Sequence, residues 1–200
     1  MFPLGVVNKV FKGVALEVNP ATNGFSDITG RHTSTLGSGI SLLPNYIQFN
    51  AGNTGLIYTG NNSDFKLNAN YKLTTRFTLL NAGDNLSLIF AVTSALNSYG
   101  ALSLFVMNGI LNFYVLGYGT SQATTAAINF NTPYDIEISV VNGVFTLKVD
   151  GSVIAQLLQP TGYRTPDPNN ALVLGALTGA SSLFDAEMTV SSLKIEVLQF

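Results

Sequence analysis

The sequence predicts an all-β domain, built as a two-sheet antiparallel sandwich, on three observations. Apolar residues recur with a period of two in several segments, turn dipeptides separate these segments, and no segment shows the 3.6-residue period of an amphipathic helix. Many short strands with frequent turns favour a sandwich or jelly roll over other fold classes.

The clearest alternation lies in residues 71–80, 134–141, 145–150 and 192–197. In the second segment Ile136 and Ile138 alternate with Asp135 and Glu137, which predicts one buried and one exposed face. Shorter strands are predicted at residues 14–18, 46–49, 56–58, 86–93, 102–107, 110–116, 153–158 and 171–174.

Turn chemistry supports these strands. The dipeptides Asn108-Gly109, Asn142-Gly143 and Asp150-Gly151 each separate two apolar runs. Asn-Gly and Asp-Gly both tolerate the positive φ angles of a type I′ turn. Three hairpins are therefore predicted.

The remaining segments set the predicted domain boundaries. Residues 19–40 are rich in Gly, Ser, Thr and Asn, and residues 159–170 contain three prolines, so both are predicted as loops. No linker divides the chain. We expect an N-terminal arm at residues 1–13 and a single domain at residues 14–200.

Composition excludes several function classes. The net charge is −2 and the nine Lys and Arg residues are scattered, which argues against nucleic-acid binding. There is no Cys and one His, so a thiolate metal site is excluded and a zinc site is disfavoured. Charged residues make up only 10%, against a usual fraction of about 25%. Either another protein chain covers part of the surface, or Asn, Ser, Thr and Gly supply its polarity.

No apolar run is long enough for a membrane-spanning helix, so no membrane insertion is predicted. Residues 1–9 lack a basic region followed by an apolar core, and they do not resemble a signal peptide.

Residues 134–151 contain an aromatic-led strand, an Asn-Gly turn, a second strand and an Asp-Gly turn. This order resembles the central hairpin of laminin-G-like, concanavalin A-like jelly-roll domains. Residues 45–49, 71–80, 171–175 and 190–195 resemble other strands of that family in the same order, and the likeness covers residues 14–197. Residues 27–32, Asp-Ile-Thr-Gly-Arg-His, resemble a turn common in the bacteriophage-encoded branch of the family.

The chain also departs from that family. Ser191 and Ser192 replace an acidic pair often found in the terminal strand, and there is no Trp to stack on a sugar ring. These departures weaken any metal or sugar-stacking role that the resemblance implies.

Catalytic patterns are sparse. Asp135 and Glu137 lie two apart on one strand, about 7 Å from each other, whereas a retaining glycosidase needs carboxyls about 5–5.5 Å apart. Asp185 and Glu187 have the same spacing. The single His32 lies in a polar turn without a nucleophile motif, which favours a turn role over catalysis. We therefore predict that the chain is not an enzyme.

Calcium binding is an alternative that the sequence leaves open. Oxygen ligands are available at Asp27, Asp64, Asp84 and Asp167, but no loop has the Asp, Asn and Gly spacing of a calcium motif. No cofactor and no metal site are predicted.

Aromatic and polar residues in loops are the candidate ligand contacts. Tyr99, Tyr118 and Tyr163 lie in such loops, with Asn97 and Arg164 beside them. Exposed Tyr and Arg are frequent anchors of binding surfaces. The alternative is that each Tyr ring packs on the edge of the sandwich.

Two functional hypotheses remain, and a third is less favoured. The family resemblance implies a non-enzymatic virion-associated structural or adhesion protein of a bacteriophage, in the capsid or the tail. Such a protein is made in the host cytoplasm, forms a homo-oligomer and contacts other virion proteins or a host-surface glycan. The alternative is a free-standing carbohydrate-binding lectin-like module, and the third reading is a degenerate glycoside hydrolase.

Overall fold

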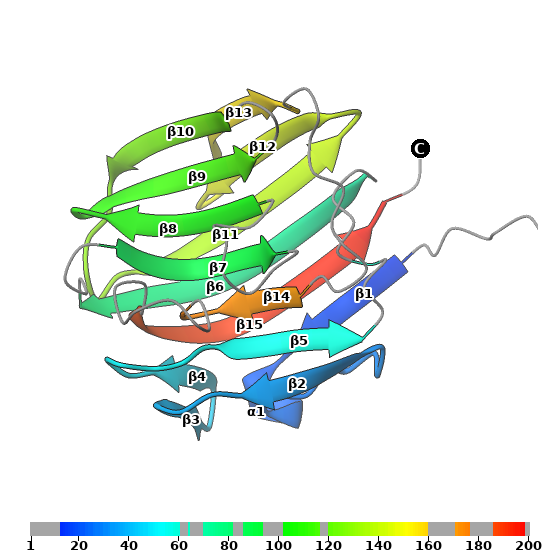
Figure 1. Ribbon diagram of the computed structural model, residues 1–200, viewed down its shortest axis with the longest axis vertical. Helices are drawn as coiled ribbons and strands as arrows, with labels where there is room; N and C mark the ends of the chain where they lie inside the picture. Colours follow the sequence, from blue (N-terminus) through cyan, green and yellow to red (C-terminus); the bar gives the residue numbers. More distant parts are fainter. Residues whose placement is uncertain are drawn as a thin grey trace, which may run out of the picture.

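The computed structural model describes residues 13–60, 64, 70–81, 86–93, 102–116, 120–159, 171–176 and 186–198. Within these residues the chain forms two antiparallel sheets that pack face to face (Figure 1). The predicted all-β, two-sheet antiparallel sandwich is confirmed.

Sheet A has eight strands within the described residues, and its order is not sequential. The order is β13 (Ser152–Leu158), β12 (Val144–Val149), β11 (Pro133–Val141), β6 (Tyr71–Asn81), β15 (Glu187–Val197), β4 (Tyr46–Phe49) and β3 (Ile40–Leu43). The eighth strand, β1 (Gly13–Val18), also pairs with β15.

Sheet B has seven strands in the described part of the chain. Its order is β10 (Thr120–Ala127), β9 (Ile110–Leu116), β8 (Leu102–Met107), β7 (Leu86–Thr93), β14 (Ala171–Leu174), β5 (Leu56–Gly60) and β2 (His32–Leu36). The one helix among the described residues, α1 (Pro20–Asn23), has four residues and is too short to cross a bilayer.

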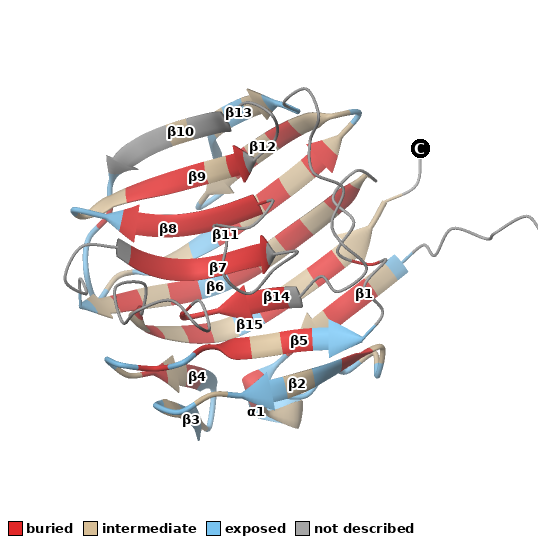
Figure 2. Ribbon diagram, in the orientation of Figure 1, coloured by how far each residue is buried: buried red, intermediate tan, exposed pale blue. Residues whose placement is uncertain are grey.

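The core lies between the sheets, and Figure 2 shows the resulting alternation of buried and less buried residues along the strands of sheet A. In β6 the residues Tyr71, Leu73, Phe77 and Leu79 are buried, as the alternation predicted. Sheet B contributes other large buried side chains, among them Phe113. Each such side chain stabilises the fold by about 1.5–3 kcal/mol.

All three predicted hairpins are present. The pair Asn142 and Gly143 has φ of 50° and 77°, and the pair Asp150 and Gly151 has 49° and 80°. Asn108-Gly109, between β8 and β9, likewise has φ of 54° and 73°. Two successive positive φ angles are the signature of a type I′ turn, whose twist matches that of the two strands.

The Asn142-Gly143 turn also fixes which residues face one another across sheet A. It pairs Val141 with Val144 and, four steps along, Glu137 with Lys148. On the other side of β11, Glu137 faces Thr74 of β6. The turn therefore assembles part of the outer face described below.

The prediction that residues 19–40 form a loop is wrong in part. Pro20 begins α1, and the side chain of Asn19 caps that helix by accepting a hydrogen bond from the Ala21 N–H. Strand β2 forms because it pairs with β5, a contact distant in sequence. Of the five β2 residues only His32 is buried, so β2 carries almost no apolar alternation.

The prediction also lacked two further strands, β10 and β3, because neither has a clear alternation of polar and apolar residues. β10 consists of Thr, Ser, Gln and Ala, without alternation of polarity, and β3 is a four-residue edge strand. β1 begins at Gly13, while the predicted arm before it and the loop after residue 159 lie outside the described residues.

Candidate functional site

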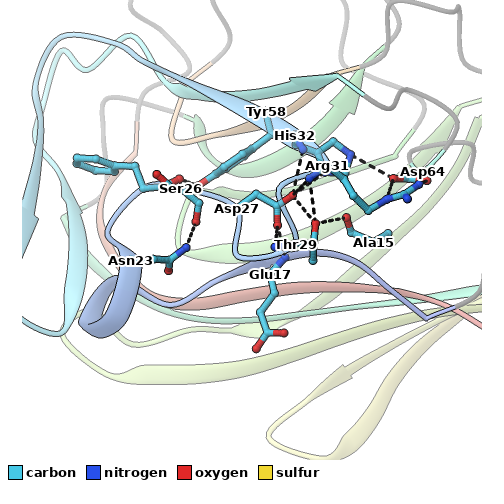
Figure 3. Close-up of polar contacts among 11 residues, drawn as sticks. Ala15, Glu17, Asn23, Ser26, Asp27, Thr29, Arg31, His32, Tyr58 and Asp64 are labelled. Carbon is cyan, nitrogen blue, oxygen red and sulfur yellow. Dashed lines mark hydrogen bonds and ion pairs between the residues drawn. The ribbon is translucent and has the colours of Figure 1, made fainter.

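The turn that follows α1 is organised around the buried carboxylate of Asp27 (Figure 3). Its Oδ1 accepts hydrogen bonds from the backbone N–H groups of Glu17 and Thr29, both at 3.0 Å. Its Oδ2 accepts from the Thr29 hydroxyl at 2.6 Å and from the N–H groups of Arg31 and His32 at 3.1 Å. One carboxylate thus ties β1, the turn and the start of β2 together.

The hydrogen-bond donors around Asp27 together affect its pKa more strongly than burial does. Desolvation alone would raise the pKa of the Asp27 carboxyl. The hydrogen bonds from Thr29, Glu17 and His32 instead hold that pKa below its ordinary value of 3.8.

His32 lies between two carboxylates. Its Nδ1 is 3.1 Å from Oδ2 of Asp27, and its Nε2 is 3.5 Å from Oδ2 of Asp64. Arg31 binds Asp64 through two parallel contacts, Nε to Oδ2 at 2.7 Å and Nη2 to Oδ1 at 2.8 Å. The exposed fractions of the Asp27, His32 and Asp64 side chains are 0%, 0% and 2%, so these three groups are shielded from solvent, whereas the Arg31 side chain is 22% exposed.

The network ties β1, the turn and β2 to one another. His32 is the first residue of β2, directly after the turn, and its predicted non-catalytic role stays a prediction. Tyr58 lies at the same corner and donates its hydroxyl to the carbonyl of Phe25 at 2.8 Å (Figure 3). Burial, and secondarily the charge of Asp27, raise the pKa of Tyr58 well above its usual range.

The calcium candidates have other partners in this network. Asp27 accepts N–H and O–H groups, and Asp64 binds a guanidinium. In the described part of the chain, no group of three or more His, Cys, Asp or Glu side chains is arranged to hold a metal ion. Asp84 and Asp167 lie outside the described residues.

A groove of about 310 Å³ opens on the outer face of sheet A, the face turned away from sheet B. It crosses the strands β15, β6, β11 and β12 and the turn before β13. Its lining comprises Thr74, Thr75, Asp135, Ile136, Glu137, Lys148, Gly151 and Ser192. Two carboxylates, an ammonium group and three hydroxyls thus gather around one hollow.

Both acidic residues of the groove are on the outer face, as the alternation predicted. The exposed fractions of the Asp135 and Glu137 side chains are 59% and 30%, while Ile136 and Ile138 are buried. Oδ2 of Asp135 pairs with Nη1 of Arg76 at 2.6 Å. Oε1 of Glu137 likewise binds Nζ of Lys148 on β12 at 2.8 Å. Each of the two carboxylates therefore has one oxygen paired with a cation.

The outer face of sheet A carries much of the charge of this weakly charged chain. Lys72, Arg76, Lys148 and Lys194 lie on it, and these are four of the nine Lys and Arg residues. Glu196 pairs with Lys72 at 3.0 Å and with Lys194 at 2.9 Å. The hydrogen bonds from Lys194 and Lys72 lower the pKa of Glu196. The cations and acids of this face thus hold one another in place.

Part of the groove could have been found from the sequence. The Asn142-Gly143 turn fixes the register of β11 against β12, and counting back from it places Lys148 opposite Glu137. Thr74 and Ser192 are different, because β6 and β15 reach the groove through long-range pairing that no local motif encodes.

The predicted loop contacts cannot be placed beside the groove. Asn97, Tyr99, Tyr118, Tyr163 and Arg164 all lie outside the described residues, and their binding role stays a prediction. Asp185 also lies outside them, whereas Glu187, its predicted companion, is half-buried on β15.

No protein-family model matches the chain, and no curated protein matches its sequence. Solved structures do match. Trypanosoma rangeli sialidase in complex with 2,3-difluorosialic acid has a TM-score of 0.76 at 16% identity, over 94% of this chain and 31% of that chain. The receptor binding domain of botulinum neurotoxin C/D mosaic serotype has a TM-score of 0.74 at 12% identity.

A third match is a botulinum neurotoxin type C structure whose cell entry depends on interaction with two ganglioside molecules. Its TM-score is 0.71 at 11% identity. The likeness establishes a shared fold. This chain spans about a third of the sialidase chain and about half of each neurotoxin chain, covering 31% and 48% of them. The β-sandwich prediction is thus confirmed, and the bacteriophage part of it stays a prediction.

Proposed function

We propose that the chain is a non-enzymatic carbohydrate-binding module and that the groove on the outer face of sheet A receives the sugar. The groove itself carries the proposal, because it brings hydroxyls, carboxylates and an ammonium group together around a volume of about 310 Å³. This lies at the lower end of the range for small-molecule sites, which is about 300–1,000 Å³.

The chemistry of the lining suits a polyol. Asp135 and Glu137 each have one oxygen paired with a cation, so the second oxygen of each carboxylate is the acceptor offered to sugar hydroxyls. Thr74 and Ser192 add groups that both donate and accept. Thr75 is committed to the fold, since its hydroxyl donates to the Ser192 carbonyl at 2.9 Å.

The charge of the lining favours a neutral sugar or an amino sugar over an acidic one. Two carboxylates and one ammonium group line the groove, a formal balance of −1. A carboxylated sugar would bring a like charge to the two acids. The fold is shared with a sialidase and with toxin chains, one of which engages gangliosides, and this supports a glycan partner in general.

The carboxylates are proposed to bind and not to catalyse. A glycosidase places its two carboxyls on either side of the scissile bond. Asp135 and Glu137 instead project from one strand to the same side, and each pairs with a cation. A host-surface glycan would also serve the adhesion role implied by the bacteriophage resemblance, and copurification with particles would test that role separately.

A glycan-binding panel tests the proposal. Neutral hexoses, amino sugars and sialylated glycans are titrated against the wild-type chain and against Asp135→Asn and Glu137→Gln. We expect at least one neutral sugar or amino sugar to bind and each substitution to weaken it by about tenfold, the loss of one hydrogen bond to a charged group.

The matched control is Glu196→Gln, which removes a carboxylate from the same face but outside the groove. It should leave sugar affinity unchanged. Wild-type protein that binds no glycan, or binding that survives both groove substitutions, would overturn the proposal.

A further inference from the structure

A β-bulge in β15 turns two successive serines to the outer face of sheet A. The pairing of β15 with β6 shifts between Val190 and Ser192, so Ser191 is the extra residue. Val190 and Leu193 are both buried in the core, and the two residues between them therefore lie on the outer side. Ser192 lines the groove, and Ser191 extends the polar surface from the groove along β15.

Beyond the bulge, the outer face of sheet A carries a row of polar side chains. Thr189 of β15 lies between Thr78 of β6 and Gln48 of β4, and Gln48 faces Ser41 of β3. Thr78, Thr189 and Gln48 are each flanked along their strands by buried residues, so they point away from the core. The row therefore lies on the same face as the groove and next to it.

This part of the outer face differs from the groove in charge. Residues 33–63, which include β3 and β4, contain no Asp, Glu, Lys or Arg. Within the described part of the chain, the hydroxyls of Thr78 and Thr189 form no hydrogen bond. Gln48 donates from Nε2 to Oδ1 of Asn50 at 2.9 Å, which leaves its carbonyl oxygen as an acceptor. Uncharged donors and acceptors of this kind suit the hydroxyls of a sugar.

An exposed aromatic ring stands beside this row. Tyr46 begins β4, two residues before Gln48 and on the same side, because Ile47 between them is buried. Ile47 pairs with Val190, and one further antiparallel step brings Tyr46 level with Ser191. The exposed fraction of Tyr46 is 36%. Its ring thus offers a flat apolar surface on which the C–H groups of a sugar ring can pack.

We propose that the groove continues into a second sugar subsite, the β4 subsite, formed by Tyr46, Gln48 and Thr189 with Ser191 at the junction. The ligand of the combined site is an uncharged linear oligosaccharide, with one ring in the groove and a further ring on Tyr46. β11 and β4 are three strand spacings apart, about 14 Å, which is more than one sugar ring spans (Figure 1). The β4 subsite rests on the proposed sugar site in the groove and adds to it the length and neutrality of the ligand.

Calorimetric titration against sugars of increasing length tests the β4 subsite. The probes are glucose, galactose, mannose and N-acetylglucosamine, each as a series of one to four linked rings, and glucosamine as the charged sugar. In a series that binds, we expect the three-ring member to bind about tenfold more tightly than the single ring, because it reaches Tyr46. Tyr46→Ala should remove this gain and leave the affinity for the single ring unchanged. A purely structural role of Tyr46 would lower both affinities.

Three further variants sharpen the test. Tyr46→Phe keeps the ring and should keep the gain. Thr189→Val removes one hydroxyl at nearly constant shape, and it should weaken only the longer sugars, by about fivefold. The control is Leu36→Ala, which truncates a 47% exposed side chain on sheet B and should change neither affinity.

The outcomes separate the β4 subsite from the groove. Equal affinity for one and three rings, a gain that survives Tyr46→Ala, or binding of glucosamine alone would overturn the β4 subsite and leave the groove proposal standing. If no sugar of any length binds, both proposals fail.

Discussion

Oδ2 of Asp27 lies 3.1 Å from Nδ1 of His32, and neither side chain has exposed area. The same carboxylate oxygen also accepts the Thr29 hydroxyl and two backbone N–H groups. A single buried acid thus satisfies donors from β1, the turn and β2, which would otherwise be desolvated without partners. The contact explains why a polar turn of low apolar content holds a fixed conformation.

Replacement of Asp27 should therefore destabilise the fold strongly. Asp27→Asn keeps the shape of the side chain but turns one acceptor into a donor that faces N–H groups. We expect the free energy of unfolding to fall by about 2–4 kcal/mol, as when one partner of a buried polar pair is removed. Urea denaturation measures this.

The control for that substitution is Asp135→Asn. The Asp135 and Arg76 side chains, which form an ion pair, are 59% and 47% exposed. This pair should therefore contribute less than about 1 kcal/mol to the free energy of unfolding. Equal losses in the two variants would contradict the anchoring role of Asp27.

Stability should also fall in acid through Asp27. Its pKa is lower in the folded chain than its ordinary value of 3.8, so the folded state binds this proton less readily than the unfolded state. The stabilisation is present in full above about pH 5 and is lost as the pH falls below 3.8 through the folded pKa. Urea unfolding at a series of acidic pH values measures the slope.

The variant Asp27→Asn shows whether Asp27 causes this pH dependence of the free energy of unfolding, because its side chain no longer titrates. The variant should lose stability less steeply than the wild type as the pH falls below 3.8. Parallel curves for the two proteins would show that other carboxyls cause the acid sensitivity.

The parallel contacts between Arg31 and Asp64 predict that lysine cannot replace arginine here. A lysine offers a point charge in place of two aligned N–H donors, so Arg31→Lys should destabilise the fold by about 1–3 kcal/mol. Thermal unfolding measures the change. Arg76→Lys is the matched control, because its contact is single and exposed, and a comparable loss there would contradict the prediction.

The sequence predicted the elements whose information is local. The alternation in β6 and β11 and the Asn-Gly and Asp-Gly turns were sufficient for their strands and hairpins, since each signal lies within a few residues. β2 and β10 were missed because their own residues are mostly polar or small, and the partner of β2, the strand β5, also lies about 20 residues further along the chain.

The candidate sites divide in the same way. The outward orientation of Asp135 and Glu137 followed from the period of the strand. The approach of Asp64 to His32 did not, because it joins a turn to a residue 32 positions later through tertiary contact. Ser192 reached the groove by the pairing of β15 with β6, which is also long-range. Residue type indicates what a side chain can do, while topology decides what it meets.

Alanine substitutions at Gly175 and Gly151 should show how much backbone strain and close packing each contribute to the loss of stability. Gly175 and Gly151 have similar φ angles, 83° and 80°, so alanine is strained at both. A Cβ at Gly175 would lie 2.3 Å from Cδ1 of Phe49, a ring buried in the core, whereas a Cβ at Gly151 would meet nothing within 4 Å. Gly151→Ala should thus lower the free energy of unfolding by about 1–2 kcal/mol. Gly175→Ala should lower it by a further 1–3 kcal/mol or so, because the ring of Phe49 must move. Urea denaturation of the two variants measures the difference, and equal losses would mean that the core around Phe49 yields without cost.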